Sequence, residues 1–197
     1  MSLKEIWQER RSFYSLGKNV QLSNEELEAM IAHYIKFCPS AFNSQSARTV
    51  LLLGANHLKL WDIVKEELSR VNQGKLSQSS LQKINAFAQA YGTVLFFEDE
   101  NVVADLQKRF SLYADNFPKW ALQANGMLEV ALWCAFKEAG LGASLQHYNP
   151  LIDACVWAEW NLPESWKLVA QMPFGSIENE AGEKTFEALD NRFKIFK

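Results

Sequence analysis

The sequence lacks the features that mark several large classes of protein. Its three cysteines, Cys38, Cys134 and Cys155, are odd in number and form no C-x-x-C pair, so a disulfide scaffold is not expected. The net charge is −3 and no run of Lys and Arg makes a basic stripe, which gives no support for binding to nucleic acid. The most apolar window, residues 120–136, is too short and too polar to span a bilayer, and the amino terminus has no apolar signal region. We therefore expect a cytoplasmic protein with reduced thiols and no membrane partner.

Recognisable catalytic and metal-binding motifs are also missing. His33, His57 and His147 are far apart and form no H-x-x-x-H or His/Cys cluster, so no dedicated metal site is expected. There is no G-x-S-x-G elbow and no phosphate-binding P-loop. Residues 140–145 begin like a dinucleotide fingerprint, but they lack the third glycine and follow a predicted helix instead of a strand. Cys38 has no activating base nearby in the sequence, so it reads as a half-buried thiol, and no residue is assigned a catalytic role.

What the sequence has in excess is aromatic residues, with seven Trp and thirteen Phe in a chain of 197 residues. Large aromatic side chains build cores, but they also line interfaces and the pockets of flat ligands. The apolar fraction of 48% and the charged fraction of 22% are typical of a globular chain. Because no internal repeat or linker interrupts it, we expect one α+β domain over residues 1–197.

Helix and strand signals follow one another along the chain. Ser2–Glu5 and Ser23–Glu26 are capping boxes that predict two helix starts, and Pro39 predicts the end of the second helix. Apolar residues at helical spacing predict further helices within 58–71, 81–91, 103–113, 118–139 and 150–157. Short apolar runs predict strands at 49–53, 92–97 and 166–174, with a short strand or extended loop at 143–148 and a surface loop at 75–80.

Two segments have more apolar surface than a monomer obviously needs. The predicted helix 118–139 is apolar around most of its circumference, so it is either the centre of the monomer or half of a subunit interface. The tail after a predicted turn at 180–183 mixes apolar residues with charges and should pack on something, with a second subunit as one option. The apolar residues of this tail are Phe186, Leu189, Phe193, Ile195 and Phe196.

A polar loop, residues 38–48, lies between the second predicted helix and the first predicted strand. Pro39 lacks a backbone donor, and short polar side chains compete for backbone hydrogen bonds, so an irregular turn is expected. Two amides and two hydroxyls within residues 40–45 make a dense set of donors and acceptors. The residues of the loop fit a surface turn or a ligand-binding loop.

Several motifs resemble those of the nitroreductase family of flavin enzymes. The first two are Arg10-Arg11-Ser12, which closes the first predicted helix, and the loop segment 39–45. Residues 45–48, 91–98 and 145–150 are more narrowly similar to the branch named after a yeast fatty-acid-repression mutant, which also has bacterial members. The resemblance covers nearly the whole chain, and the motifs occur in the expected order.

The resemblance implies both a fold and an assembly. The fold is a nitroreductase-like α+β fold with a central, mostly antiparallel sheet surrounded by helices. The assembly is an intertwined homodimer with both active sites at the subunit interface, in which the C-terminal arm, residues 185–197, packs on the partner subunit. The implied cofactor is FMN, and the implied electron donor is NADH or NADPH.

The family pattern assigns phosphate and flavin-edge contacts to basic residues at both ends of the chain. Arg10 and Ser12 would touch the flavin tail or ring edge, with Arg11 close by, and Arg192 and Lys194 would supply positive charge to the phosphate. The alternatives are a pair of arginines that stabilises a helix C-terminus and an ordinary solvated tail.

The same pattern places two further segments around the flavin ring. Asn43 and Gln45 offer amide groups to the pyrimidine edge, and Pro39 and Ser40 would pack on the ring from the partner subunit. The stretch 145–147 would pass the reactive flavin nitrogen through backbone groups, and His147 is equally a residue of the pocket wall. The residues of this stretch are Leu145, Gln146 and His147.

Three positions depart from the common family pattern. Tyr14, which we count among the flavin-binding residues, stands where many members have a basic residue. Residues 45–47 read Gln-Ser-Ala instead of Gln-Pro-Trp, and residues 87–90 lack a lysine that many members place there. The departures suit the narrower branch, and they leave the acceptor range and the choice between NADH and NADPH open.

Three functional hypotheses follow. The resemblance implies an FMN-dependent NAD(P)H oxidoreductase that reduces nitroaromatics, quinones or similar flat, electron-poor acceptors by a ping-pong hydride mechanism. The second hypothesis is a flavin-binding regulator in redox stress or lipid signalling, in which turnover is incidental. The third is a cofactor-free helical interaction module, which rests on the Trp-rich faces and the apolar tail alone.

Overall fold

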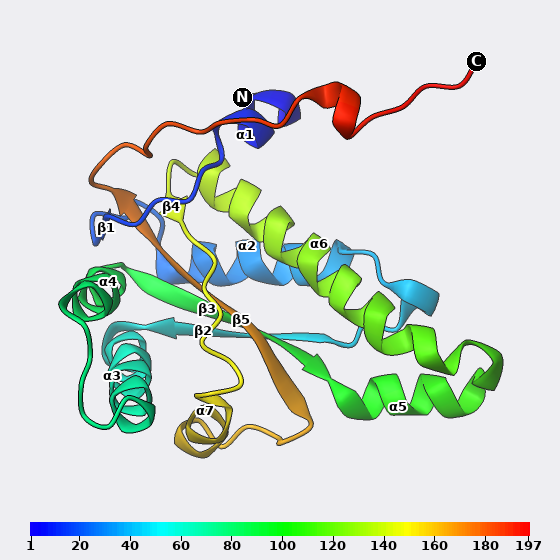
Figure 1. Ribbon diagram of the computed structural model, residues 1–197, viewed down its shortest axis with the longest axis horizontal. Helices are drawn as coiled ribbons and strands as arrows, with labels where there is room; N and C mark the ends of the chain where they lie inside the picture. Colours follow the sequence, from blue (N-terminus) through cyan, green and yellow to red (C-terminus); the bar gives the residue numbers. More distant parts are fainter.

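The computed structural model describes residues 1–197 and shows an α+β fold in which helices cover both faces of an antiparallel sheet (Figure 1). The strand order is β1-β5-β3-β2, and β4 pairs with β5 outside this path. Every strand pairing is antiparallel, as the family resemblance implied for most of the sheet. The strands are β1 (Leu16–Gly17), β2 (Ala47–Leu53), β3 (Gly92–Asp99), β4 (Gly142–Ala143) and β5 (Trp166–Ile177).

The helices fall into two groups around this sheet. Helices α2 and α6 pack on one face, and α3, α4 and α7 pack on the other. Helix α1 lies beside α6, whereas α5 and the turn after it form a corner at the start of α6. The α-helices are α1 (Leu3–Glu9), α2 (Asn24–Phe37), α3 (Gly54–Val71), α4 (Gln78–Ala88), α5 (Glu100–Arg109), α6 (Phe117–Glu138) and α7 (Asp153–Glu159). Short 3-10 helices are η1 (Ala41–Asn43), η2 (Ser111–Asn116) and η3 (Leu189–Asn191).

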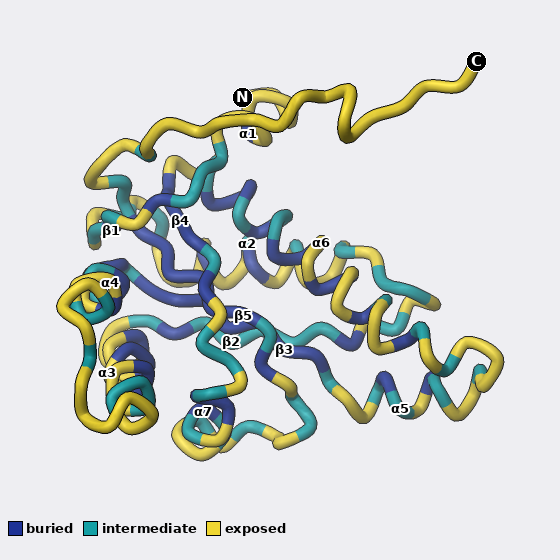
Figure 2. The backbone as a smooth tube through the Cα atoms, viewed as in Figure 1, coloured by how far each residue is buried: buried dark blue, intermediate teal, exposed yellow.

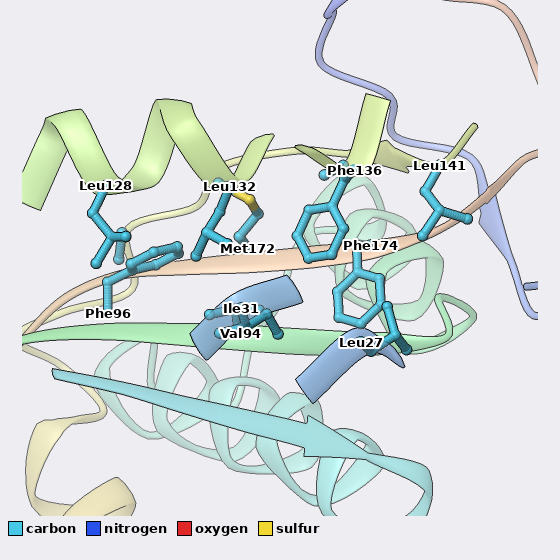
Figure 3. Packing of buried hydrophobic residues seen from close by; sticks show 12 residues of the cluster. Leu27, Ile31, Val94, Phe96, Leu128, Leu132, Phe136, Leu141, Met172 and Phe174 are labelled. Atoms are coloured by element: carbon cyan, nitrogen blue, oxygen red, sulfur yellow. The ribbon is translucent and has the colours of Figure 1, made fainter. Parts of the chain in front are cut away.

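Strand β3 is buried on both of its faces. Val94 and Phe96 point toward α2 and α6, whereas Leu95 and Phe97 belong to the core under α3, α4 and α7. Because side chains alternate between the two faces of a strand, burial on both faces requires the continuous apolar run that predicted this strand. In the α6 core the ring of Phe174 on β5 stacks on the ring of Phe136, with ring centroids 4.4 Å apart (Figure 3).

Both predicted capping boxes form. At the start of α2 the backbone N–H of Glu26 donates to Ser23 Oγ at 3.1 Å, and the N–H of Ser23 donates to Glu26 Oε2 at 2.8 Å. The same reciprocal pair joins Ser2 and Glu5 at the start of α1. Each box satisfies two backbone donors that the helix itself leaves unpaired, so these helix starts were predictable from local sequence.

Four predicted helix boundaries were wrong. Helix α4 ends at Ala88, so Tyr91, which the prediction placed in this helix, lies in the bend before β3. Residues 78–80 lie in α4 instead of a loop, because Ser77 Oγ accepts the N–H of Ser80 at 3.1 Å and starts the helix there. Helix α5 ends at Arg109, since Phe110 has φ −127° and ψ 60°, and Tyr113 lies in the 3-10 turn beyond it. Helix α7 begins at Asp153, three residues later than the prediction that started at Pro150.

The long helix and the tail retain exposed apolar surface. Helix α6 buries one side against the sheet, but Leu122 and Met127 remain exposed on it. After β5 the chain runs along the edge of the molecule that carries α1 and ends away from the helices (Figure 1), and residues 182–197 are exposed throughout (Figure 2). Packing of this arm on a partner therefore stays a prediction. None of the helices is long and apolar enough to cross a membrane.

Candidate functional site

The segment after α1 forms one wall of a cavity of about 550 Å³. Ser12 pairs with Ala143 in a parallel bridge, and the N–H of Phe13 donates to the carbonyl of Ala143 at 3.0 Å. This pairing fixes the segment against β4 and turns neighbouring side chains toward the cavity. The cavity is lined by Arg10, Arg11, Ser12, Tyr14, Ser15, Asn179, Glu180, Ala181, Gly182, Glu183 and Lys184. The four site residues predicted near the amino terminus are thus brought together.

Arg10 is a half-buried cation without an anionic partner. Its guanidinium carbon lies 4.3 Å from the centroid of a Trp133 ring on α6, and neither Arg10 nor Arg11 belongs to any ion pair of the structure. Burial lowers the pKa of Arg10, because the low-dielectric surroundings disfavour its charged form. Arg11 donates to the carbonyl of Gly182 across the cavity. Neither side chain bonds the last carbonyls of α1, so the contacts do not favour the helix-stabilising alternative.

The stretch after β4 runs along the edge of β5 and alternates in its hydrogen bonding. The N–H of Gln146 donates to the carbonyl of Gln171 at 2.8 Å, and the N–H of Gln171 donates back to Gln146 at 2.9 Å. The backbone N–H groups of Leu145 and His147 have no partner in the protein. Because neighbouring residues of an extended segment face opposite ways, these two groups point away from β5. They are the backbone groups of this predicted stretch that remain available to a ligand.

The polar loop adopts a strained backbone. Phe42, Asn43 and Gln45 have φ values of 56°, 51° and 50°, the left-handed region that non-glycine residues seldom occupy. Such conformations cost on the order of 1–3 kcal/mol each and cluster at functional sites. The N–H of Gln45 donates to Ser40 Oγ at 2.9 Å, while the side-chain amides of Asn43 and Gln45 are exposed and make no hydrogen bond within the protein. The loop thus presents two free amides from a fixed backbone.

An aromatic cage holds the middle of this loop. The Phe42 ring lies between the end of α5, the 3-10 helix η2 and the start of α6, and each aromatic pair contributes about 0.5–1.5 kcal/mol beyond area burial. The ring centroid of Phe42 is 4.8 Å from Phe110, 5.3 Å from Phe117, 6.1 Å from Trp120 and 6.2 Å from Tyr113. These contacts offset the strain of the left-handed backbone. We define Phe110, Tyr113, Phe117 and Trp120 as the aromatic cage.

Buried polar groups support the base of the loop. Asn125 on α6 donates through Nδ2 to Glu98 Oε1 at 2.8 Å and to the carbonyl of Phe97 at 3.1 Å. The N–H of Asp99 donates to the carbonyl of Ser46 at 3.0 Å, which ties the loop to the end of β3. Burial raises the pKa of Glu98, although its polar neighbours Ser46 and Asn125 oppose this shift. Glu98 Oε2 and Asn125 Oδ1 have no hydrogen-bond partner.

A second cavity, of about 360 Å³, opens beside the loop. The predicted residues Pro39, Ser40 and Gln45 line it together with residues of α2, β2, α6 and β5, whereas Asn43 lies just outside it. Cys38 also lines this cavity, and burial raises the pKa of its thiol, so it is not an activated thiolate. The other lining residues are Ile35, Lys36, Ala47, Arg48, Thr49, Ala124, Leu128 and Trp166.

The two cavities share no residue within one chain. One holds the predicted amino-terminal site residues, and the other holds the predicted loop residues. Arg192 and Lys194 line neither cavity, and they lie in the exposed arm without an ion pair. A single subunit therefore does not assemble the predicted set of residues.

Some residues of the site had no signal in the sequence. Trp133 gave no hint of its contact with Arg10, because the two are brought together only by the packing of α1 on α6. Of the 179–184 wall, the sequence predicted only a turn at 180–183, and Lys184 had no signal of its own. Phe42 was visible as an aromatic residue in a polar loop, and that contrast was the one usable signal.

A larger cavity than these two lies elsewhere. It measures about 810 Å³ between α3 and α4 and contains none of the predicted site residues. Acidic and basic side chains, including Asp62, Lys65, Glu66 and Arg70, line it together. Ligand sites are mostly apolar with a few convergent polar groups, so we regard this depression as a solvated charged surface. No group of His, Cys, Asp and Glu in the structure could hold a metal ion.

Comparison with known proteins agrees with this fold. The model of the nitroreductase family matches residues 8–176. Two Saccharomyces cerevisiae proteins named as nitroreductases, HBN1 and FRM2, are 34% and 31% identical to the chain over 95% of its length and 93% of theirs. FRM2 is the fatty-acid-repression mutant protein, which confirms the narrower branch.

Similar solved structures are also nitroreductases. The nitroreductase CinD from Lactococcus lactis, in complex with nicotinic acid, has a TM-score of 0.93 and 49% identity, with 100% of both chains covered. A nitroreductase structure from Saccharomyces cerevisiae has a TM-score of 0.77 and 28% identity over 88% of this chain and 94% of that one. The predicted fold class is confirmed. The chain belongs to the nitroreductase family of flavin-dependent enzymes and is a nitroreductase-type oxidoreductase.

Proposed function

We propose that the protein is an FMN-dependent NAD(P)H oxidoreductase that reduces nitroaromatics, quinones or similar flat, electron-poor acceptors. The observation that carries this proposal is the half-buried guanidinium of Arg10, which has no anionic partner and lies at a cavity with Arg11 and Ser12. The phosphate of FMN is the kind of anion that such a cation binds, and hydrogen bonds from guanidinium to phosphate are strong. Glu180 and Glu183 line the same cavity without pairing with either arginine.

The free polar groups of the protein fit the flavin ring. The pyrimidine edge of the ring needs both donors and acceptors, which the unpaired amides of Asn43 and Gln45 provide. The unpaired N–H groups of Leu145 and His147 supply donors along the β5 edge. When bound, FMN supplies the redox chemistry by taking a hydride from NADH or NADPH and passing electrons to an acceptor after the nucleotide has left, which is a ping-pong cycle.

The ligands of the CinD structures support the acceptor class. CinD has been solved with nicotinic acid, chloramphenicol and 4-nitrophenol, each of which carries an aromatic ring. At 49% identity over the whole chain, a similar slot for flat aromatic molecules is expected here. No side-chain nucleophile is needed for such a reaction, in agreement with the lack of a catalytic motif in the sequence.

A homodimer completes the site in this proposal. The loop of one subunit would face Arg10, Ser12 and the 145–147 stretch of the other, which explains why one chain leaves the two sets of residues in separate cavities. The single domain of residues 1–197 would extend the arm, residues 185–197, onto its partner, where Arg192 and Lys194 would approach the phosphate. An apolar groove of about 330 Å³, lined mainly by α1 and α6, is a suitable receptor for the arm's apolar side chains. We place the enzyme in the cytoplasm, because its cysteines are free thiols.

The decisive experiment is anaerobic spectroscopy of the purified protein. We expect a yellow protein whose visible band bleaches on addition of NADH or NADPH and recovers when an acceptor such as 4-nitrophenol or a quinone is added. A stoichiometric flavin that neither nucleotide bleaches would favour the regulator instead. A colourless protein that takes up no added FMN would overturn the proposal and leave the interaction module.

Substitution of Arg10 tests the observation on which the proposal rests. Arg10→Ala should bind FMN about ten- to a hundredfold more weakly, because a charge-assisted hydrogen bond contributes about 1.5–3 kcal/mol. Arg70→Ala is the matched control, since Arg70 is an exposed arginine of α3 that pairs with Glu67 and lines neither proposed cavity. Equal FMN affinity in the two variants would contradict the assigned role of Arg10.

Deletion of the arm tests the dimer separately. A chain ending at residue 184 should retain less FMN and shift toward the monomer in light scattering, because it loses the exposed apolar residues of the arm and two of the proposed phosphate ligands. A truncated protein that stays yellow and dimeric would contradict this use of the arm without affecting the oxidoreductase proposal.

A further inference from the structure

The backbone of the polar loop needs an external restraint. Three of its non-glycine residues, Phe42, Asn43 and Gln45, are left-handed, a combination that local preference does not produce. Strained conformations persist only when the surrounding structure over-determines them. The hydrogen bonds from the N–H groups of Asn43 and Gln45 both end on Ser40, which belongs to the same loop. Arg48 donates to the carbonyl of Gln45, and the N–H of Asp99 donates to the carbonyl of Ser46, so hydrogen bonds tie the end of the loop to the sheet but do not reach its middle at Phe42 and Asn43.

Phe42 supplies an anchor from the middle of the loop. Its ring enters the aromatic cage, whose members come from the end of α5, from η2 and from the start of α6. Phe42 is itself a left-handed residue and directly precedes Asn43. Movement of the Phe42 ring out of the cage would release the restraint on the residue whose amide, in the proposed function, faces the flavin.

The contact is specific in its geometry. The Phe42 ring stacks on Trp120 with an interplanar angle of 20° and meets Phe117 edge-on at 66°. Aromatic pairs prefer these offset-stacked and edge-to-face arrangements, so a ring of similar shape is needed to keep both contacts. Even so, 52% of the Phe42 surface is exposed, which makes its replacement compatible with folding of the domain.

We propose that Phe42 is a positioning residue, which locks the 39–46 loop through the aromatic cage so that Asn43 and Gln45 are pre-organised for FMN. This inference rests on the proposed FMN site and adds a residue that does not itself touch the cofactor. A fixed loop binds more tightly than a mobile one, because the ordering entropy has already been lost before the ligand arrives. The cage also links the corner formed by α5 and η2 to the flavin-facing loop.

The test compares three variants of the full-length chain. Phe42→Ala keeps the Cβ atom, so the cost of the left-handed backbone stays while the ring is lost. Phe42→Trp keeps an aromatic ring. Phe37→Ala is the matched control, because Phe37 is an exposed phenylalanine at the end of α2 that lies outside the cage. The readouts are the FMN dissociation constant from quenching of flavin fluorescence, the thermal midpoint without FMN, and hydrogen exchange of the Asn43 and Gln45 amides without FMN.

Phe42→Ala should raise the FMN dissociation constant about tenfold or more. It should also speed amide exchange in the loop more than the control does, while the thermal midpoint without FMN stays above the assay temperature. Phe42→Trp should restore most of the affinity. Unchanged affinity in Phe42→Ala, equal losses in Phe42→Ala and the control, or no rescue by Phe42→Trp would each overturn the inference.

Failure of the FMN proposal would give a different pattern. If the unmodified protein does not bind FMN, the proposed function falls and the lock is judged by hydrogen exchange alone. Faster exchange at Asn43 and Gln45 in Phe42→Ala then still supports the lock, and unchanged exchange overturns it.

Discussion

The two ends of β3 carry buried polar networks that differ in one respect. At the first end, Trp61 Nε1 donates to Thr93 Oγ1 at 3.2 Å, and His57 lies 2.9 Å from that oxygen through Nδ1 and 3.3 Å from the Ala88 carbonyl through Nε2. Every one of these groups is paired. At the second end, Glu98 and Asn125 share one hydrogen bond but leave one oxygen each without a partner. We call these the closed end and the open end of β3.

The closed end determines its own protonation. The Ala88 carbonyl only accepts, so His57 must carry its proton on Nε2, and Nδ1 must then accept from the Thr93 hydroxyl. Burial lowers the pKa of His57 to about 4, which keeps the ring neutral at physiological pH. Such a network is complete without a ligand, and it lies on the face covered by α3 and α4. Its function is to hold the fold.

The open end lies under the proposed flavin loop. The N–H of Asp99 donates to the carbonyl of Ser46 at the base of that loop. Asp99 directly follows Glu98, whose Oε2 has no hydrogen-bond partner. Buried polar groups almost always have a hydrogen-bond partner, so two neighbouring oxygens without one, Glu98 Oε2 and Asn125 Oδ1, need a physical reason. A proton on Glu98 gives its second oxygen a hydrogen to donate, and the burial-raised pKa of Glu98 favours that proton. Of the two ends of β3, the one with incomplete pairing is therefore the end that supports the proposed flavin loop.

The largest effect should come from breaking the closed end. Thr93→Val leaves Nδ1 of His57 and Nε1 of Trp61 unpaired in the core, which should lower the free energy of unfolding by about 2–5 kcal/mol. Trp61→Phe removes one donor and leaves the His57 contact, so its loss should be smaller. Urea unfolding followed by circular dichroism measures both. FMN bound per folded molecule should be unchanged, and a Thr93→Val protein as stable as the parent would refute the structural role of this network.

Acid should weaken the closed end through His57. The pKa of His57 is about 4 in the folded state against the ordinary histidine value of 6.5, so the unfolded chain binds more protons between these pH values. Stability from this residue is therefore full above pH 6.5 and is lost as the pH falls toward 4, by up to about 3 kcal/mol. His57→Gln should lack this dependence. Urea midpoints from pH 4.5 to 7.5 would test it, and equal slopes in the two proteins would refute it.

The smallest expected effect is the pH dependence of stability that Glu98 contributes at the open end, and its sign is opposite to that of His57. Burial raises the pKa of Glu98, so the folded state holds its proton longer than the unfolded chain, and stability falls as the pH rises above the unfolded value of 4.5. The polar neighbours Ser46 and Asn125 and the charge of Arg48 offset part of this shift. The free energy of unfolding of Glu98→Gln minus that of the parent should therefore be larger at pH 8 than at pH 5. A variant whose relative stability is the same at both pH values would show that Glu98 is ionised throughout.

Local sequence predicted the parts of this fold that depend on local physics. The two capping boxes and the buried strand 92–97 were confirmed because their signals lie within a few residues. Strand β1 was missed, since its two residues form only by pairing with the end of β5. The prediction for helix 118–139 did not decide between the centre of the monomer and half of a subunit interface. The structure shows one side of α6 in the core and leaves the interface untested.

The site was less accessible to reasoning from residues alone. The polar loop could be singled out, but its role came from family resemblance, because the partners of each residue lie far away in sequence. The left-handed backbone at Phe42 was not predictable, since a bulky residue is among the last expected there. The contact between Arg10 and Trp133 likewise exists only once α1 has packed on α6.

The left-handed residues of the loop have a consequence for protein engineering. Glycine adopts positive φ without strain, so a search for thermostable variants would be drawn to Asn43→Gly and Gln45→Gly. Those two changes would remove the only free amides that the loop offers to a ligand. Selection for thermal resistance would therefore favour glycine at positions 43 and 45, whereas selection for cofactor affinity would keep Asn43 and Gln45.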